Sequence, residues 1–418
     1  MQWLKTFNFI IALLFTLCYA YQFIYIFIGT FLKSKKFPDV TPKNRYAILI
    51  AARNESLVIG HLLDSINSQT YPSELIDVYV VADNCTDSTG DISREKGATV
   101  YERFSERHIG KGYALKLCFK NIFDTKGDSY YDGYMVLDAD NVLDKDYVYE
   151  MDKTMSAGNK IITSYRNSKN YGRNWISSGY ALWFLHEAKH LNNPRFILGT
   201  SCAISGTGFL VHRDVINEQG GWSHFLLTED IEFSVDHIIK GYKIAYCHNA
   251  VLYDEQPVKF SQSWTQRLRW AKGFLQVVRN YGSALIKSIF KGSGFSSFDM
   301  LFTIMPAFFI SIFAMLTNIG SVLYTGIFAQ GLFLTALGEL LKIIGGVYVT
   351  LFIVGIVSGI TEWKKIHAST FKKIKSFFTF PLFMMTYLPI SAAAIFKRVI
   401  WAPIEHTDAV TLDEITNS

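Results

Sequence analysis

The chain has 418 residues, and its 41 lysine and arginine residues against 36 aspartate and glutamate residues give a net charge of +5. Half of the residues are hydrophobic and 15% are aromatic, which excludes an intrinsically disordered chain. Much of the basic excess lies beside apolar runs, as on the cytoplasmic loops of membrane proteins, so we expect no nucleic-acid partner. The five cysteines form no CxxC pair, which argues against a disulfide framework or a zinc site and fits a reducing compartment.

The first predicted element is a membrane anchor. Residues 7–31 carry no charged side chain, and about twenty apolar residues are enough to cross the hydrocarbon core of a bilayer. A signal peptide would have a shorter apolar centre followed by a small-x-small cleavage site, and neither is present. We therefore expect residues 1–33 to form a retained N-terminal transmembrane anchor.

A soluble domain follows at about residues 40–260, and its first half alternates between strands and helices. Apolar runs bounded by polar residues predict strands, and apolar residues at helical spacing predict the helices between them. The predicted strands cover 46–52, 76–82, 99–102 and 134–138, and the predicted helices cover 56–68, 88–96 and 112–125. This alternation indicates an α/β fold with a mostly parallel sheet covered by helices on both faces.

Polar residues follow the carboxyl ends of these strands, where ligands of such sheets bind. Asp138 and Asp140 supply hard oxygen atoms that suit Mg²⁺ or Mn²⁺ and hence a diphosphate, although solvated turn aspartates are an alternative. Asp83 is placed to accept hydrogen bonds from a nucleobase or ribose, or to cap the next helix. Lys111, between two glycines, offers a cation to a phosphate. The spacing of a phosphate-binding loop and a GxGxxG motif are both missing.

Residues 183–208 lie beyond this alternating half, and we expect them to line a channel for the acceptor. His186 and His190 stand at the i, i+4 spacing of a helix, which invites a metal-site interpretation. No HExxH pattern or third ligand accompanies them. We therefore favour two helix-face histidines without a metal.

Residues 261–299 mix tryptophans with arginine and lysine residues in an amphipathic pattern. This pattern is typical of helices that lie in the headgroup region of a membrane, and an ordinary core-facing helix is the alternative. Residues 300–400 then form the predicted C-terminal transmembrane region. Its three apolar runs cover 301–324, 343–360 and 377–396.

The distribution of positive charge predicts the orientation of these segments. Residues 33–283 and the lysine-rich segment 364–375 belong in the cytoplasm by the positive-inside rule. If the last apolar run spans fully, Lys397 and Arg398 lie outside and break the rule. If that run bends at Pro381 and Pro389, the tail returns to the cytoplasm.

The motifs of the soluble domain resemble those of the family 2 glycosyltransferases. Within that family the chain is similar to the processive, membrane-bound, inverting branch that includes cellulose, chitin and hyaluronan synthases. The resemblance covers about residues 40–290 and implies a GT-A-like nucleotide-sugar-binding domain. It is carried, in chain order, by ARNE, ADNCTDST, GKGYAL, DAD, GTSCAISGTG, TED and QRLRW.

The resemblance also implies roles for individual residues. Asp230 would be the general base, Asp140 would hold Mg²⁺ or Mn²⁺, and Glu229 would tune the base or contact the acceptor. Asp138 would contact the nucleotide and donor, and Lys111 the diphosphate. The remaining substrate-binding residues would be Asn54, Glu55 and Asp83 for the nucleotide, and Gln266, Arg269 and Trp270 for the diphosphate and the acceptor sugar.

These roles together imply an inverting hexosyltransferase of the plasma membrane with its catalytic domain in the cytoplasm. It would use UDP-glucose or UDP-N-acetylglucosamine to elongate a glycan acceptor processively, and would export the polysaccharide alone or with a homo-oligomer or an accessory subunit. Transfer of one sugar to a lipid-linked or short acceptor is the alternative, and a non-catalytic nucleotide-binding membrane protein is a more remote one.

Two features depart from the pattern of the family. Ala51 and Arg53 stand where many relatives have proline and tyrosine, which leaves the stacking of the nucleobase unexplained. The residues 401–407, the first part of a predicted tail over 401–418, either close over the site from the cytoplasmic side or only cap the chain.

Overall fold

The structure is a computed structural model, and it describes residues 1–416. Its centre is an eight-stranded sheet in the order β3-β2-β1-β4-β7-β6-β8-β5. The strands are β1 (Tyr46–Ala52), β2 (Ile76–Asp83), β3 (Thr99–Arg103), β4 (Gly133–Asp138), β5 (Val142–Leu143), β6 (Ile161–Ser168), β7 (Phe209–His212) and β8 (Ile244–Asp254).

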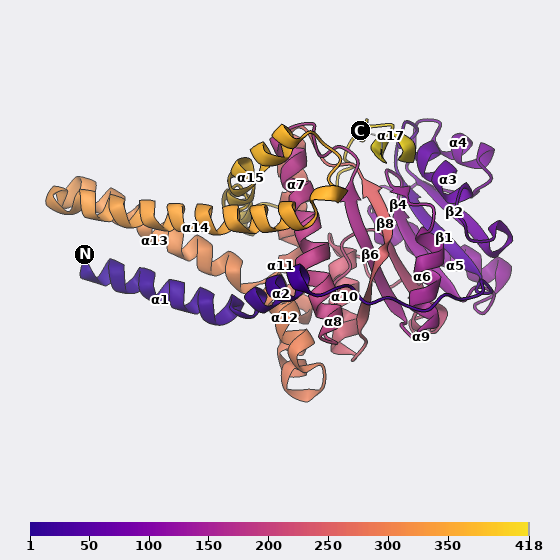
Figure 1. The fold of residues 1–418 in the computed structure, drawn as a ribbon, viewed down its shortest axis with the longest axis horizontal. Helices are drawn as coiled ribbons and strands as arrows, with labels where there is room; N and C mark the ends of the chain where they lie inside the picture. Colours follow the sequence, from indigo (N-terminus) through magenta and orange to yellow (C-terminus); the bar gives the residue numbers. More distant parts are fainter. Residues whose placement is uncertain (417–418) are drawn as a thin grey trace.

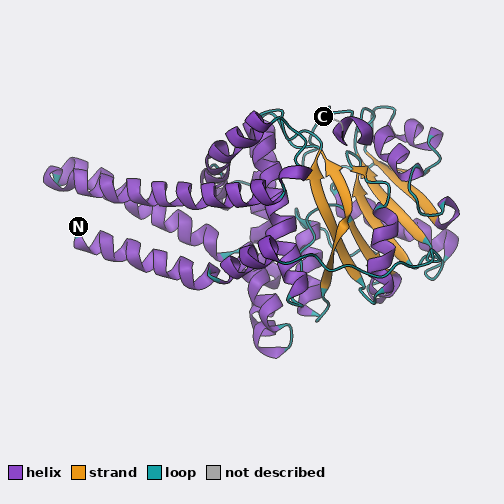
Figure 2. Ribbon diagram, in the orientation of Figure 1, coloured by secondary structure: helices purple, strands orange, loops and turns teal. Residues whose placement is uncertain are grey.

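Helices cover both faces of this sheet (Figures 1 and 2). In the domain they are α3 (Ile59–Asn67), α4 (Thr89–Glu95), α5 (Lys111–Lys126), α6 (Tyr147–Ser156), α7 (Trp175–His186), α8 (Asn193–Ile197), α9 (Arg213–Glu218) and α10 (Glu229–Ile239). Two buried apolar clusters lie on the two faces of the sheet, because alternate residues of β1 point to opposite sides: Ala47 and Leu49 to one, Ile48 and Ile50 to the other.

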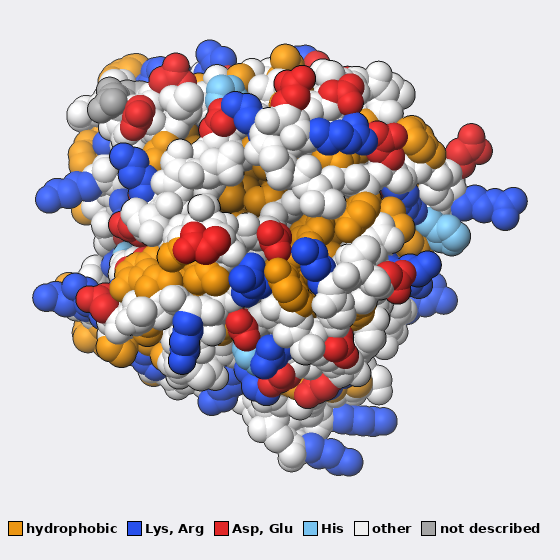
Figure 3. Space-filling view, turned by 90° about the vertical axis from the view of Figure 1, so that its right-hand side faces the viewer, with side chains coloured by type: hydrophobic (Ala, Val, Ile, Leu, Met, Phe, Trp, Pro, Cys, Tyr) orange, Lys and Arg blue, Asp and Glu red, His pale blue; other side chains and the backbone are white. Residues whose placement is uncertain are grey.

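The predicted α/β fold is confirmed. The strands β1, β2, β3 and β4 pair in parallel, and only β7 and β5 run against their neighbours. Parallel pairing brings the carboxyl ends of β1, β2 and β4 to one edge of the sheet. The register Ala52↔Ala82 and Ala51↔Asp138 places the residues that follow these strands next to one another. On the face of the domain opposite the long apolar helices, acidic and basic side chains are interspersed (Figure 3).

The N-terminal anchor differs from the expected single helix over residues 7–31. The chain forms α1 (Gln2–Tyr19) and a separate α2 (Tyr21–Phe31). The helix α2 packs against the domain because Tyr21 and Tyr25 each donate a hydrogen bond of 2.8 Å to the buried carboxylate of Asp299. Of the two helices, α1 is the one that packs along the apolar helices formed by residues 306–361.

The remaining helices are α11 (Phe260–Lys291), α12 (Gly294–Ile304), α13 (Pro306–Phe328), α14 (Phe333–Thr361), α15 (Thr370–Met385), α16 (Tyr387–Phe396) and the short α17 (Leu412–Thr416). Four stretches are long and apolar enough to cross a membrane: residues 2–19, 294–328, 330–361 and 370–396. The helices α1, α13 and α14 extend away from the domain side by side, whereas α15 stays beside it, against α7 (Figure 1).

The bend between α15 and α16 is fastened by α11. Arg267 is fully buried and donates hydrogen bonds to the carbonyl of Phe383, at 3.1 Å, and to the hydroxyl of Thr386, at 2.8 Å. Lys272 donates to the carbonyl of Ala394 near the end of α16, at 2.9 Å. Because both ends of α16 are tied to α11, the chain that leaves α16 stays close to the domain.

Candidate active site

One cavity of about 170 Å³ lies at the carboxyl edge of the parallel strands. It gathers every site residue predicted from the sequence except Asn54. Its predicted lining residues are Glu55, Asp83, Lys111, Asp138, Asp140, Glu229, Asp230, Gln266, Arg269 and Trp270. Asn54 lies exposed at the rim, in a left-handed backbone conformation, and its side-chain oxygen accepts a hydrogen bond from the backbone N–H of Thr86, at 2.8 Å. In this structure Asn54 therefore holds the loop after β2.

The first side of the cavity is built by Asp83, the last residue of β2. Its carboxylate pairs with the guanidinium of Arg103, at 2.5 Å, and the side chain is almost fully buried. Burial raises the pKa of Asp83, and the positive charges of Arg103 and Arg53 counteract this effect. A carboxylate fixed in this way can accept a hydrogen bond from a ligand at the sheet edge.

Asp138 and Asp140 lie at the end of β4, next to Lys111. The ammonium group of Lys111 contacts Asp138 at 2.5 Å and the carbonyl of Gly206 at 2.8 Å. Asp140 is buried and accepts a hydrogen bond from the backbone N–H of Glu255, at 2.8 Å. Burial alone would raise the pKa of Asp140. Nearby positive charges, the largest effect being that of His406, outweigh burial and leave the pKa below its usual value, so this carboxylate stays ionised.

Glu229 and Asp230 open helix α10 on the other side of the cavity. Burial raises the pKa of both carboxyl groups, that of Glu229 to about 7 with a contribution from the charge of Asp230. The cations of Lys111 and Arg269 lower both pKa values in part. A raised pKa suits a carboxylate that takes up a proton near neutral pH.

The helix α11 contributes the QRLRW residues and is itself tied to the loop before α10. Arg269 donates a hydrogen bond to the carbonyl of Leu227, at 2.9 Å. Gly273 gives Thr228 room, since a Cβ atom at this glycine would lie 2.5 Å from the threonine side chain. Trp270 packs edge-on against Tyr180, with ring centroids 5.8 Å apart. These contacts hold Arg269 and Trp270 in place beside the start of α10.

The predicted residues miss a second group of side chains in the same cavity. Arg166 and Asp254 come from the ends of β6 and β8 and form an ion pair, and Glu255 follows directly. The sequence carried a signal for this group, because YCHNAVLYDE has the same apolar run ending in acids as the first strands. This run predicts a further strand, and Asp254 and Glu255 follow its apolar part as Asp83 and Asp138 follow theirs.

The tail crosses the mouth of the cavity. His406 contacts the carboxylate of Glu55 at 2.9 Å, and the backbone N–H groups of Thr407 and Asp408 donate to Glu255 at 2.9 and 3.0 Å. Burial alone would lower the pKa of His406. The negative charges of Asp140 and Glu55 outweigh burial and raise the pKa to about 10. The protonated imidazole therefore lies among carboxylates. Of the two roles considered for this segment, closing over the site is the one that its position fits.

The carboxylates around His406 fit a divalent cation. Glu55, Asp138, Asp140 and Glu255 all line the cavity and offer oxygen ligands of the kind that Mg²⁺ and Mn²⁺ prefer. Their combined negative charge exceeds that of the one imidazolium and the Lys111 ammonium beside them. Asp138 and Asp140 are thus suited to hold a metal ion that accompanies a diphosphate.

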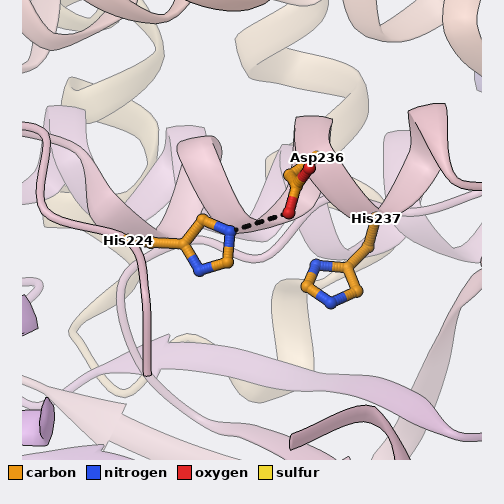
Figure 4. Close-up of side chains that lie close together, drawn as sticks. All are labelled: His224, Asp236 and His237. Atoms are coloured by element: carbon orange, nitrogen blue, oxygen red, sulfur yellow. Dashed lines mark hydrogen bonds and ion pairs between the residues drawn. The ribbon is translucent and has the colours of Figure 1, made fainter. Parts of the chain in front are cut away.

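Another group with metal-ligand chemistry lies outside the cavity. The ligand atoms of His224, Asp236 and His237 come within 4.8 Å of one another (Figure 4). His224 contacts the Asp236 carboxylate at 3.0 Å, Lys240 donates to the same oxygen at 2.8 Å, and His237 donates to the carbonyl of Phe233 at 2.8 Å. Through the contact between His224 and Asp236, the cluster fastens the loop before Thr228 to α10, and Nδ1 of His224 is buried without a hydrogen-bond partner among the described residues.

His186 and His190 likewise have protein partners. His186 pairs with the hydroxyl of Ser358 at 3.0 Å, and His190 with the hydroxyl of Thr361 at 3.1 Å. Burial lowers the pKa of His186 to about 3 and that of His190 to about 4, so both rings are neutral. These contacts dock the end of α14 onto the domain, as expected for helix-face histidines.

Three comparisons identify what the chain is similar to. The family model described as "Glycosyltransferase like family 2" matches residues 42–273, more than half of the chain. Probable glycosyltransferase YdaM of Bacillus subtilis is 27% identical over 294 residues, which cover 63% of each chain. The beta-monoglucosyldiacylglycerol synthase of Synechocystis sp. is 25% identical, covering 58% of this chain and 50% of that one. The poly-beta-1,6-N-acetyl-D-glucosamine synthase of Staphylococcus epidermidis is also 25% identical, covering 57% of each.

A solved mannosyltransferase of Pyrobaculum calidifontis shares the fold, with a TM-score of 0.55 and 15% identity over 94% of this chain and 99% of that one. The chain spans between 50% and 63% of the length of the three curated relatives. The shared stretch contains the sheet edge and the acidic cavity, with Asp83, Asp138 and Asp230. The chain belongs to the glycosyltransferase family 2 and carries a GT-A-like domain.

Proposed function

We propose that this protein is an inverting, metal-dependent β-glycosyltransferase that uses a UDP-sugar to elongate a polysaccharide processively at a membrane. The observation that carries the proposal is one cavity lined by Asp83, Asp140 and Asp230 together with Arg269 and Trp270. Such a reaction needs a site for the nucleotide, an acid that binds the metal, a general base, and a side chain that packs against the acceptor sugar. The donor is UDP-glucose or UDP-N-acetylglucosamine.

In this mechanism Asp230 removes the proton from the acceptor hydroxyl while the hydroxyl oxygen attacks the anomeric carbon of the donor. The bond from that carbon to the UDP oxygen breaks at the same time. One direct displacement inverts the anomeric centre, so an α-linked donor gives a β-linked product. The departing diphosphate gains negative charge, which the cations of Lys111 and Arg269 stabilise.

Asp138 and Asp140 would hold Mg²⁺ or Mn²⁺ at the diphosphate, and the metal supplies further charge stabilisation there. Gln266 and Arg269 bind the diphosphate from α11. Trp270 lines the cavity and offers its ring to the sugar of the acceptor. Because Trp270 is held by Tyr180 on α7 and lies on the helix that carries Arg269, acceptor and donor are aligned by one element.

The position of the tail supports one membrane arrangement. Since His406 contacts Glu55, the chain after α16 lies on the catalytic side. We therefore place α1, α13 and α14 across the bilayer and let α15 and α16 enter and leave it on the cytoplasmic side of a plasma membrane. Lys397 and Arg398 then lie in the cytoplasm with the other lysine-rich segments, which satisfies the positive-inside rule.

A second candidate is transfer of a single sugar to a lipid-linked acceptor. The small number of crossing helices favours it, because α1, α13 and α14 alone are a narrow route for an exported chain. Similarity to both a glycolipid synthase and a poly-N-acetylglucosamine synthase leaves both acceptor types within the family. Under the processive proposal, a second copy or an accessory subunit completes the export route.

The size of the product separates the two candidates. The full chain in lipid nanodiscs is incubated with each UDP-sugar, Mn²⁺ and lipid extract, and the products are separated by length and digested with linkage-specific glycosidases. Polymers with β-linkages, shortened in Trp270→Ala, support the processive proposal. A single sugar on a lipid supports the second candidate, and polymer lengths unchanged in Trp270→Ala contradict the role of this side chain.

A further inference from the structure

The wall of the cavity beside Asp83 contains no aromatic residue from β1. That strand and the residue after it contribute Ala51, Ala52 and Arg53. A nucleobase, however, binds most often with its face against an aromatic ring or a guanidinium plane. If the cavity holds a nucleotide, as the proposed function requires, this chain needs another surface for the face of the base.

Arg53 is placed to provide that surface. The register pairs Ala52 of β1 with Ala82 of β2, so the next residues, Arg53 and Asp83, lie side by side on neighbouring strands. Neighbouring strands are about 4.8 Å apart. A base whose edge meets the Asp83 carboxylate would therefore lie next to the Arg53 guanidinium. Within residues 1–416, the Arg53 side chain makes no hydrogen bond or short ion pair, which leaves its plane free to stack.

The indole ring of Trp401 faces the guanidinium of Arg53 across the mouth of the cavity. The guanidinium carbon lies 5.4 Å from the ring centroid, and both residues line the cavity. The tail brings the ring there, because His406, five residues later, is bonded to Glu55 at the same mouth. Residues 398–411, all described, form no helix or strand, so this stretch can shift without breaking one.

We propose that Arg53 and Trp401 form the two faces of the nucleobase site, with the base of the donor nucleotide stacked between the guanidinium and the indole. Asp83, held by Arg103, then reads the edge of the base. The planar guanidinium replaces the aromatic side chain that β1 lacks, and the tail contributes the second face.

The geometry sets the size of the movement that binding requires. A base stacked between two flat groups needs about 3.5 Å on each side, hence about 7 Å between them. The Arg53 guanidinium carbon lies 5.4 Å from the centroid of the Trp401 ring, which is less than this spacing, so Trp401 has to move outward by at least about 2 Å when the base enters. This shift is small for a segment without regular structure, and the inserted base then bridges the tail and the sheet.

The experiment measures binding of UDP and of inorganic pyrophosphate, each with Mn²⁺, to the full chain in nanodiscs by calorimetry. Stacking on an aromatic ring contributes about 1–3 kcal/mol per base, so Trp401→Ala and Arg53→Ala should each weaken UDP about 5- to 150-fold. Pyrophosphate has no base, and its affinity should stay within about twofold in both variants. Trp175→Ala, which removes a half-exposed indole outside the cavity, is the matched control.

Arg53→Lys distinguishes stacking from simple attraction to the diphosphate. Lysine keeps the charge but has no plane, so under the proposal it weakens UDP as alanine does. Affinity for UDP restored by lysine, or equal loss of UDP and pyrophosphate in Arg53→Ala, would overturn the role of Arg53. Tighter or unchanged UDP binding in Trp401→Ala would overturn that of Trp401. If the wild-type chain binds pyrophosphate but not UDP, the proposed function fails together with this inference.

Discussion

Replacing Asp230 with asparagine tests the role of the proposed base with the least disturbance. The half-buried side chain lines the cavity at the start of α10, and one of its oxygens lies 4.0 Å from where a Cβ would stand on Gly206. Asparagine has the same shape and accepts hydrogen bonds, so the helix start and the cavity wall should be preserved. The variant loses the negative charge and the capacity to take up a proton, at nearly unchanged side-chain volume.

General-base catalysis is worth about 10²- to 10⁴-fold in rate, or about 3–5 kcal/mol of barrier. We therefore expect kcat of Asp230→Asn to fall by that factor. Affinity for UDP should stay within a few fold, because Asp83, the proposed nucleotide ligand, lies at the end of β2 and is held by Arg103. The assay follows release of UDP from the donor sugar, and calorimetry with UDP reports binding to the same preparation.

Two results would refute this reasoning. A kcat within about tenfold of wild type would show that another group takes the proton, and Glu229 would be the first candidate. Loss of UDP binding in the same variant would show that Asp230 shapes the nucleotide site, so that the lower rate says nothing about a base. Asp124→Asn, at an exposed position of α5 outside the cavity, is the control for the effect of an aspartate-to-asparagine change.

Three further outcomes are expected. Glu229→Gln should remove any titration near pH 7 from the kcat/KM profile, because burial and the negative charge of Asp230 raise the pKa of Glu229 to about 7; an acid limb near pH 7 that persists in the variant would contradict this assignment. Chelation should abolish turnover and added Mn²⁺ should restore it in wild type but not in Asp140→Asn, as followed by UDP release; activity that survives chelation would reject the metal site. Asp299→Asn should destabilise the protein by about 3–5 kcal/mol, since it leaves Arg195 buried without its ion-pair partner at 2.7 Å. The unfolding midpoint in detergent should therefore fall, and an unchanged midpoint would contradict a stabilising role of this ion pair.

The sheet and its acidic edge were predictable because they depend on local sequence. An apolar run followed by an acid marks both a buried strand and its carboxyl end, so β1 was predicted at its observed bounds. Asp83 and Asp138 followed from the same pattern at β2 and β4. Parallel pairing of the strands then brings their carboxyl ends to one edge of the sheet, so the clustering of these acids needs no further information from the sequence.

The parts that escaped prediction depend on contacts between distant segments. Nothing local in the tail shows that His406 lies against Glu55, 351 positions earlier. No glycine or proline stands at Ala20, where the helix is interrupted between α1 and α2. The tyrosines of α2 donate hydrogen bonds to Asp299, a contact that the local sequence does not reveal. Asn54 was assigned to the substrate because of its place after β1, yet the turn directs its side chain to the loop after β2.

The most direct test of the central claim is the release of UDP by purified protein in nanodiscs. UDP-glucose and UDP-N-acetylglucosamine are supplied separately with Mn²⁺ and a glycan primer, and GDP-mannose serves as the comparison donor. We predict release of UDP from one of the two UDP-sugars, dependent on Mn²⁺ and lost in Asp230→Asn. Turnover of GDP-mannose alone, or equal turnover by wild type and Asp230→Asn, would contradict a UDP-sugar transferase built on this acidic cavity.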